Sequence, residues 1–313
     1  MPRLLAPISR LLAAATERRV AQPGWRAPVP VICCGNASMG GTGKTTVALD
    51  IGRRLAARGV ALHFLLRGYG GKVKENRRVV PGDTAALVGD EALLLNDVAP
   101  TWIGGDRAIS ARAAVAQGAK ILVMDDGLQN PSLERDVSLL VVDGAVGFGN
   151  GLVVPAGPLR EPVAAAAARC HAAVIIGDDK HFVIDQIPQD LPILRARLRP
   201  GAEMLALRGR PVFAFAGIAS PDKFFTSLEE AGALVHGKVA FADHHPFKDS
   251  EIIQLMDQAE KLGAVAVTTP KDAVRLSRAL RQRVLSAGVD LEWQRPAHIE
   301  ELLTELLAKP VRG

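Results

Sequence analysis

The sequence predicts an α/β fold in which a mostly parallel β-sheet is flanked by helices, followed by a second, smaller α/β unit. From residue 28 onward, short apolar segments rich in β-branched residues alternate with segments of helical periodicity, which is the rhythm of βαβ units. The 313 residues suit two domains, or one large domain with an elaboration. Apolar residues make up 48% of the chain, which is enough for a sizeable core.

Composition excludes several classes of protein. Charged residues make up 23%, and the 30 Gly and 20 Pro are spread along the chain, which excludes disordered, collagenous and coiled-coil proteins. Aromatic residues are only 4%, so few rings are available to stack on bases and no nucleic acid is expected as a partner. The net charge of +5 favours anionic partners in general. Cys33, Cys34 and Cys170 are odd in number and form no Cys-x-x-Cys pair, which indicates a reducing compartment.

Residues 1–25 are expected to form an amphipathic helix apart from the α/β units. Arg10 interrupts the apolar stretch too early for a secretory signal, and no uncharged run approaches the roughly 18–20 residues of a membrane-spanning helix. Six apolar residues share one face of the helical wheel, namely Leu4, Leu5, Ile8, Leu11, Leu12 and Ala15. This face either packs on the protein's own core or lies in a membrane interface.

The first α/β unit is expected over residues 26–207. Runs of apolar and β-branched residues predict strands at Val29–Cys34, Ala61–Leu66, Lys120–Met124, Val137–Val142 and Ala173–Ile176. Apolar residues at helical spacing predict helices at Lys44–Arg58, Glu91–Val98 and Ala108–Gln117. The stretch from Gln186 to Pro211 contains prolines and has weak periodicity, so we expect a connection there.

The second, smaller unit is expected over residues 208–313. It begins with the apolar strand PVFAFAGIA and a helix that carries Phe224, Phe225 and Leu228. The same patterns then predict a helix at Asp249–Leu262, a strand at Ala264–Thr268 and helices at Ala273–Leu280 and Ile299–Leu307.

A glycine-rich loop joins the first strand to the first helix of the large unit. In such a loop, backbone N–H groups surround phosphate oxygens and the helix N-terminus adds its positive dipole. The expected phosphate-binding residues are Ser38, Met39, Gly40, Gly41, Thr42, Gly43, Lys44 and Thr45. Lys44 is expected to reach the β- and γ-phosphates of a nucleotide, and the Thr45 hydroxyl to bind Mg²⁺. Ser38 stands where the strict pattern has Gly. The segment predicts a fold of the P-loop NTPase type.

Two pairs of acidic residues are candidate functional residues near this loop. Asp125 and Asp126 end the apolar strand of KILVMDDGLQN, where phosphate-loop proteins carry an acid that holds Mg²⁺. The sequence does not say which of the two faces the metal, and both could instead cap the next turn. Asp90 and Glu91 begin the helix of VGDEALLL, where a carboxylate is often only a first-turn residue stabilised by the helix dipole. Glu91 is added to Thr45, Asp125 and Asp126 as a candidate metal ligand.

The segment FADHHPF of the second unit places Asp243, His244 and His245 in a row after an apolar strand. A zinc site is not predicted, because no third or fourth ligand follows at a recognisable spacing. Proton handling across a cleft between the units is the alternative role.

Together these segments resemble the tetraacyldisaccharide 4′-kinase family, which phosphorylates a lipid A precursor on the cytoplasmic side of the inner membrane of Gram-negative bacteria. The shared segments follow in the same order along nearly the whole chain: LLAPISRLL, the GGTGKT loop, LRGYGG, VGDEALLL, DDGLQN, GFGNGLVVPAGPLREP, FAGIASPDKFF, FADHHPF and TTPKDAVRL. The GNG and PAGPLRE part has no counterpart in generic nucleotide-binding proteins, which makes the resemblance specific.

The resemblance implies transfer of the γ-phosphate of ATP, with Mg²⁺, to the 4′-hydroxyl of tetraacyldisaccharide 1-phosphate. It implies that Asp90 acts as base on the sugar hydroxyl and that His244 is its partner. The substrate contacts that it implies are Arg67, Tyr69, Asn150 and Arg160. A structural salt bridge remains the alternative role for each of the two arginines. The resemblance also implies peripheral attachment to the cytoplasmic face of the inner membrane and no obligate protein partner.

The chain departs from the family pattern at three positions. Thr46 follows the loop where Pro is common, Asn130 stands where His is frequent, and Phe247 stands where Tyr is frequent. These departures leave the fine positioning of the substrate open.

Two other functions compete with the kinase. A membrane-associated partitioning-type P-loop ATPase also combines GGTGKTT with an amphipathic helix, but that class carries a lysine before the Gly-Gly pair, where this chain has Met39. A guanine-nucleotide metal chaperone would need Asn-Lys-x-Asp, whereas Lys271 and Asp272 of TTPKDA are adjacent.

Overall fold

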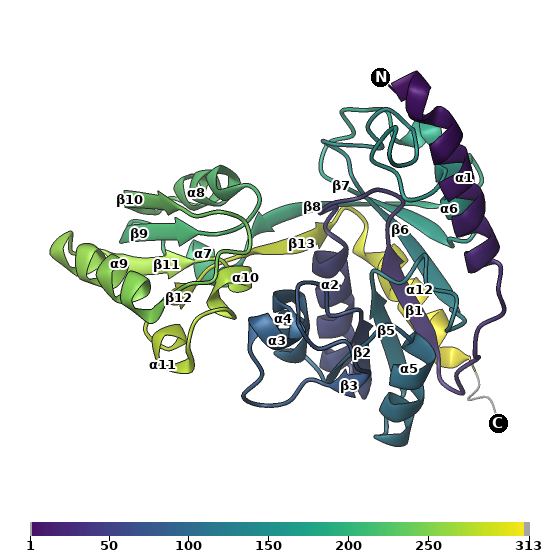
Figure 1. Cartoon of the computed structure of the whole chain (residues 1–313). Helices are drawn as coiled ribbons and strands as arrows, with labels where there is room; N and C mark the ends of the chain where they lie inside the picture. Colours follow the sequence, from purple (N-terminus) through teal and green to yellow (C-terminus); the bar gives the residue numbers. More distant parts are fainter. Residues whose placement is uncertain (1, 310–313) are drawn as a thin grey trace.

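The computed structural model describes residues 2–309, with side chains from Leu5 onward, and contains two β-sheets (Figure 1). Within these residues the larger sheet has nine strands in the order β13-β8-β7-β6-β1-β5-β2-β4-β3. Their bounds are β1 (Val31–Gly35), β2 (Leu62–Leu66), β3 (Arg77–Arg78), β4 (Thr101–Ile103), β5 (Ile121–Asp125), β6 (Val137–Asp143), β7 (Ala172–Ile176), β8 (Ile193–Pro200) and β13 (Val289–Trp293). All neighbours pair in parallel except β3 with β4 and β13 with β8.

Helices cover both faces of the larger sheet, which explains why strands such as β1 and β5 are buried at every residue. On one face pack α2 (Lys44–Ala57), α4 (Asp90–Asn96) and α12 (Pro296–Ala308). On the other face pack α5 (Arg107–Ala116), α6 (Val163–Ala167) and the edge of α1 (Pro2–Val20). The short helix α3 (Ala85–Val88) precedes α4. The predicted α/β class, with a mostly parallel sheet flanked by helices, is confirmed.

The smaller sheet has four parallel strands in the order β10-β9-β11-β12 within the described residues. These are β9 (Pro211–Ala216), β10 (Leu234–Ala240), β11 (Val265–Thr268) and β12 (Leu285–Ser286). One face is covered by α8 (Pro221–Glu230), whose two phenylalanines are buried, together with α7 (Ala202–Leu205). The other face is covered by α9 (Asp249–Lys261) and α11 (Arg278–Arg281).

Three sequence-based expectations about the second half of the chain were wrong. The expected connection from Gln186 to Pro211 contains β8, after the 3₁₀ turn η1 (Ile184–Gln186). The helix expected at Ala273–Leu280 is two short helices, α10 (Pro270–Ala273) and α11. The last part of the range 208–313 does not belong to the smaller sheet, because β13 pairs with β8 and α12 packs in the core of the larger sheet. The pairing of β8 with β13 joins residues some 90 positions apart, and local periodicity does not predict such a pairing.

Helix α1 contacts the rest of the protein through small residues and turns its large apolar residues outward. Ser9 is buried, and its hydroxyl accepts a hydrogen bond from the backbone N–H of Ala156 at 3.2 Å. Ile8, Leu11 and Leu12 are 49%, 72% and 43% exposed. The alternative that this apolar face packs on the protein's own core is therefore wrong for these three residues. The side chain of Leu4 lies outside the described residues.

No helix among the described residues is long and apolar enough to cross a membrane.

Candidate active site

The glycine-rich loop lies between β1 and α2, at the carboxyl edge of the larger sheet. Gly43 precedes α2 with φ of 86°, in the left-handed region that favours glycine. The Lys44 ammonium lies inside the loop, 3.5 Å from the carbonyl oxygen of Gly40 and 3.8 Å from Asp126. The backbone N–H of Met39 donates to the carbonyl of Pro158 at 2.7 Å, so the loop also contacts the PAGPLRE segment.

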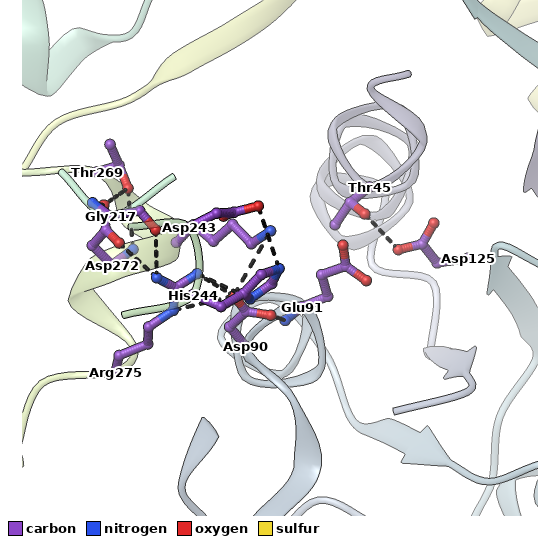
Figure 2. A network of polar contacts seen from close by, with 11 residues as sticks. Thr45, Asp90, Glu91, Asp125, Gly217, Asp243, His244, Thr269, Asp272 and Arg275 are labelled. Carbon is purple, nitrogen blue, oxygen red and sulfur yellow. Dashed lines mark hydrogen bonds and ion pairs between the residues drawn. The ribbon is translucent and has the colours of Figure 1, made fainter. Parts of the chain in front are cut away.

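The two aspartates at the end of β5 have different surroundings. Asp125 is buried and accepts a hydrogen bond from the Thr45 hydroxyl at 2.8 Å (Figure 2). Asp126 has φ of 55° and turns away, with one carboxylate oxygen 2.7 Å from Arg160. Burial, and next the charge of Glu91, raises the pKa of Asp125 to about 7. Of the two aspartates, Asp125 is the one that lies beside Thr45.

This pair suits a magnesium ion. Among the described residues no three His, Cys, Asp or Glu side chains gather as a ready metal site. Mg²⁺ does not require one, because it is usually held by one or two carboxylates together with water and substrate phosphates. The Oδ1 atom of Asp125 is buried and has no hydrogen-bond partner within the described residues, so an acceptor is available next to Thr45. Glu91 projects from α4 toward the same pair (Figure 2).

Asp90 begins α4 and is 4% exposed. The preceding Gly89 has φ of 88°, and a Cβ atom there would lie 2.4 Å from the carbonyl oxygen of Tyr69, so the motif requires glycine. The backbone N–H of Glu91 donates to Asp90 Oδ1 at 3.0 Å. The position is a helix start, as expected, but the carboxylate also has partners from the smaller unit.

Three side chains of the smaller unit converge on Asp90. Figure 2 shows two of them, His244 and Arg275. His244 Nδ1 lies 3.1 Å from Asp90 Oδ2, the Lys271 ammonium lies 3.8 Å away, and Arg275 donates through both Nε and Nη2. Burial raises the pKa of Asp90, but Lys271, Arg275 and His244 outweigh burial and hold this pKa below its usual value. The carboxylate is therefore ionised at neutral pH.

The two histidines of FADHHPF have separate environments. His244 has φ of 59°, and its backbone N–H donates to the carbonyl of Gly217 at 3.0 Å, which directs its ring toward Asp90. His245 instead lies 3.1 Å from Glu251 and stacks on Phe241 with ring centroids 4.7 Å apart. His244 therefore reaches α4, while His245 packs within the smaller unit.

The segment TTPKDAVRL supplies residues to which sequence reasoning assigned no role. Asp272 is fully buried and accepts hydrogen bonds from the Thr269 hydroxyl at 2.7 Å and from the backbone N–H of Gly217 at 3.1 Å. Arg275 donates to Asp272 at 2.9 Å and to the carbonyl of Gly217 at 2.8 Å while it also binds Asp90. The i, i+3 spacing of Asp272 and Arg275 could have predicted an ion pair between them. Nothing in the sequence indicated that Arg275 also binds Asp90 on α4.

The four predicted substrate residues lie in different settings. Arg160 donates to Asp126 and so lies beside the glycine-rich loop. Arg67 and Tyr69 follow β2, and Tyr69 is 73% exposed. Asn150 uses both ends of its amide in its own loop, donating to the carbonyl of Ala156 at 2.9 Å and accepting from the N–H of Leu152 at 3.1 Å.

Comparison with known proteins extends the likeness to nearly the full chain. The sequence model of the tetraacyldisaccharide-1-P 4′-kinase family matches residues 1–308. The tetraacyldisaccharide 4′-kinase of Gluconacetobacter diazotrophicus is 53% identical over 308 residues, covering 98% of this chain and 94% of the relative. The corresponding protein of Gluconobacter oxydans is 50% identical over 307 residues, with coverage of 98% and 94%.

A crystal structure of LpxK from Aquifex aeolicus in complex with ATP has the same fold, with a TM-score of 0.77 at 22% identity. The match covers 98% of this chain and 99% of that one, so both sheets take part in it. Because the family model and relatives at about half identity span the loop, the acidic pairs and the segments of the smaller unit together, the chain belongs to the tetraacyldisaccharide-1-P 4′-kinase family.

Proposed function

We propose that this protein transfers the γ-phosphate of ATP, with Mg²⁺, to the 4′-hydroxyl of tetraacyldisaccharide 1-phosphate, a step of lipid A biosynthesis. One observation carries the proposal. The Thr45–Asp125 pair beside the glycine-rich loop faces, across Glu91, the Asp90–His244 pair that forms between the two units (Figure 2). A phosphate-binding half and an acceptor-binding half thus meet at one place. The names of the relatives support the same substrate.

The loop side of the site is proposed to hold the nucleotide. Lys44 would contact the β- and γ-phosphates, and Thr45 and Asp125 would hold Mg²⁺ with Glu91 as a further ligand. Bound Mg²⁺ neutralises charge on the phosphate oxygens. Arg160 and Asp126 form an ion pair at 2.7 Å next to Lys44, and this pair limits where the phosphates can lie.

The acceptor side is proposed to position the sugar hydroxyl. The 4′-oxygen attacks the γ-phosphorus, the bond from that phosphorus to the ADP oxygen breaks, and the hydroxyl proton passes to Asp90. His244, 3.1 Å from the same carboxylate, orients it and shares the proton. Because three basic side chains keep Asp90 ionised, its contribution is a hydrogen bond that aligns the hydroxyl more than a strong basicity.

The partitioning-type ATPase has less support. Met39 occupies the position of the lysine that would reach a second subunit, and the matching family model is that of a kinase.

Peripheral membrane attachment through α1 is proposed with this function. The substrate is a lipid, and Ile8, Leu11 and Leu12 turn outward from the protein. Arg18 and Arg19 lie in the last turn of the same helix, where basic side chains favour an anionic leaflet by about 1 kcal/mol each near the surface. We place the protein at the cytoplasmic face of the inner membrane, where ATP is available.

The function itself predicts a labelled product. Incubation with γ-labelled ATP, Mg²⁺ and tetraacyldisaccharide 1-phosphate should place the label in a bisphosphorylated lipid. Lys44→Ala should abolish this transfer because it removes charge stabilisation of the phosphates, while circular dichroism should show an unchanged fold. Lys120→Ala, at an exposed lysine on another part of the larger unit, is the matched control and should keep full activity. An unlabelled lipid with the wild type contradicts the function, and a fully active Lys44→Ala variant contradicts the nucleotide site.

The pairing of Asp90 with His244 predicts a non-additive loss of rate. Asp90→Asn and His244→Ala should each lower kcat by on the order of 10²–10⁴ while KM for ATP changes little, and the double variant should lose little more than either single variant. His245→Ala is the control, because that ring contacts Glu251 and Phe241 and not Asp90. Multiplying losses in the double variant, or equal losses at His244 and His245, would argue against a joint role.

The outward apolar face of α1 predicts vesicle binding. Ile8→Asp with Leu12→Asp should release the protein from anionic vesicles and raise the apparent KM for vesicle-embedded substrate, yet leave kcat for detergent-dispersed substrate unchanged. Ile109→Asp with Ile253→Asp removes apolar residues of matched exposure, 50% and 43%, from other helices and should leave binding intact. Equal sedimentation of all three proteins with the vesicles would refute the role of α1.

A further inference from the structure

In the mechanism above the segment TTPKDAVRL serves only to keep Asp90 ionised, and Lys271 is its one charged residue whose hydrogen-bond donors are unused. Its side chain is 30% exposed and its ammonium lies 3.8 Å from Asp90 Oδ2, which is an ion pair beyond hydrogen-bond distance. No oxygen of the described residues accepts a hydrogen bond from it, whereas Arg275 on the same segment donates to three groups. The three N–H donors of Lys271 are therefore free for a ligand.

The backbone that carries Lys271 is firmly held. The next residue, Asp272, is fully buried and receives hydrogen bonds from Thr269, Gly217 and Arg275. Helix α10 packs against α4, the helix of Asp90 and Glu91. The Lys271 stem therefore starts from a fixed point at the interface, while its four-carbon chain lets the ammonium move by a few ångströms.

The charge of Lys271 acts on Glu91 as well as on Asp90. Burial raises the pKa of Glu91, and the charge of Lys271 is the strongest of the charges that oppose this rise, ahead of that of Lys44 of the loop. Glu91 in turn acts on Asp125. Glu91 is thus under the charge of a lysine from each unit. Its side chain lies between Asp90 and the Thr45–Asp125 pair, where the proposed phosphoryl transfer would occur (Figure 2).

Asp90 does not need Lys271 as a hydrogen-bond partner. Its carboxylate already accepts from two nitrogens of Arg275 and from the N–H of Glu91, and it lies 3.1 Å from His244. Lys271 at 3.8 Å stabilises the charge of this carboxylate but gives it no hydrogen bond, so its N–H donors do not fix the position of Asp90. The position of Lys271 is better suited to an anion that arrives between Asp90 and the loop.

We propose that Lys271 is a further catalytic residue, delivered by the smaller unit, whose ammonium donates hydrogen bonds to the oxygens of the γ-phosphoryl group during transfer. The inference rests on the proposed function. In the step, the acceptor oxygen bonds to the γ-phosphorus, the bond to the ADP oxygen breaks, and the hydroxyl proton leaves toward Asp90. Lys271 keeps its proton throughout and neutralises charge on the transferred group from the side opposite Lys44.

Lys271→Met tests the proposal, since it keeps most of the stem and removes the charge. We expect kcat to fall by about 10²–10³, the loss that removal of one such donor causes. Binding gives a readout apart from turnover. By calorimetry, the affinity for a non-hydrolysable ATP analogue should fall about tenfold while the affinity for ADP is unchanged, because only the analogue carries the γ-phosphate.

Two further variants separate this role from a structural one. Lys238→Met removes an exposed lysine of the smaller unit that pairs with Glu229 at 2.6 Å and should leave kcat and both affinities unchanged. Lys271→Arg keeps the charge and should retain the preference for the ATP analogue over ADP. Lys271→Gln, which also removes the charge, replaces Lys271→Met if that variant does not fold. The proposal is overturned if Lys271→Met lowers the affinities for the ATP analogue and for ADP equally. It is also overturned if the variant lowers the melting temperature without changing the ratio of these two affinities. An inactive wild type would instead remove the proposed function, so the two failures are distinguishable.

Discussion

The ion pair between Asp90 and Arg275 is the contact on which the arrangement of the site depends. Both side chains are at least nine-tenths buried, with exposed fractions of 4% and 6%, and they come from different units of the chain. Removing one partner of a buried ion pair is strongly unfavourable, so this pair favours the arrangement in which the two units are in contact, although Arg275 also pairs with Asp272 of its own unit. The contact holds the smaller unit against the start of α4, where His244 and Lys271 can reach the same carboxylate.

The way the chain leaves the smaller unit reinforces this contact. After β12, the chain returns to the larger sheet as β13 and continues into α12, and both elements bond to α2, the helix that follows the glycine-rich loop. Trp293 donates to Asp50 at 2.6 Å, and Arg54 and Arg58 pair with Glu300. The exit of the smaller unit is thus attached to the nucleotide helix, so the two halves of the site are linked through the backbone as well as through Asp90.

Local features of the sequence predicted local structure well. The strands that became β1, β2, β5, β6 and β7 and the helix after the loop were found because apolar periodicity and glycine spacing act over a few residues. The partner of Asp90 on TTPKDAVRL was not predicted, since 185 residues separate Asp90 from Arg275. Whether Asp125 or Asp126 faces Thr45 depends on the turn after β5, where Asp126 takes a positive φ that no pattern announces. The sequence could not show that the apolar face of α1 points outward, because that depends on whether another part of the folded protein packs against it.

The most direct test of this account is a double-mutant cycle on the free energy of unfolding with Asp90→Leu and Arg275→Met. Each single variant removes one partner of this buried ion pair and should lose about 3–5 kcal/mol. The double variant removes both charges and should be no less stable than either single one, which gives a coupling energy of about 3 kcal/mol or more. Losses that simply add, with no coupling between the two sites, would contradict the claim that this pair joins the two units.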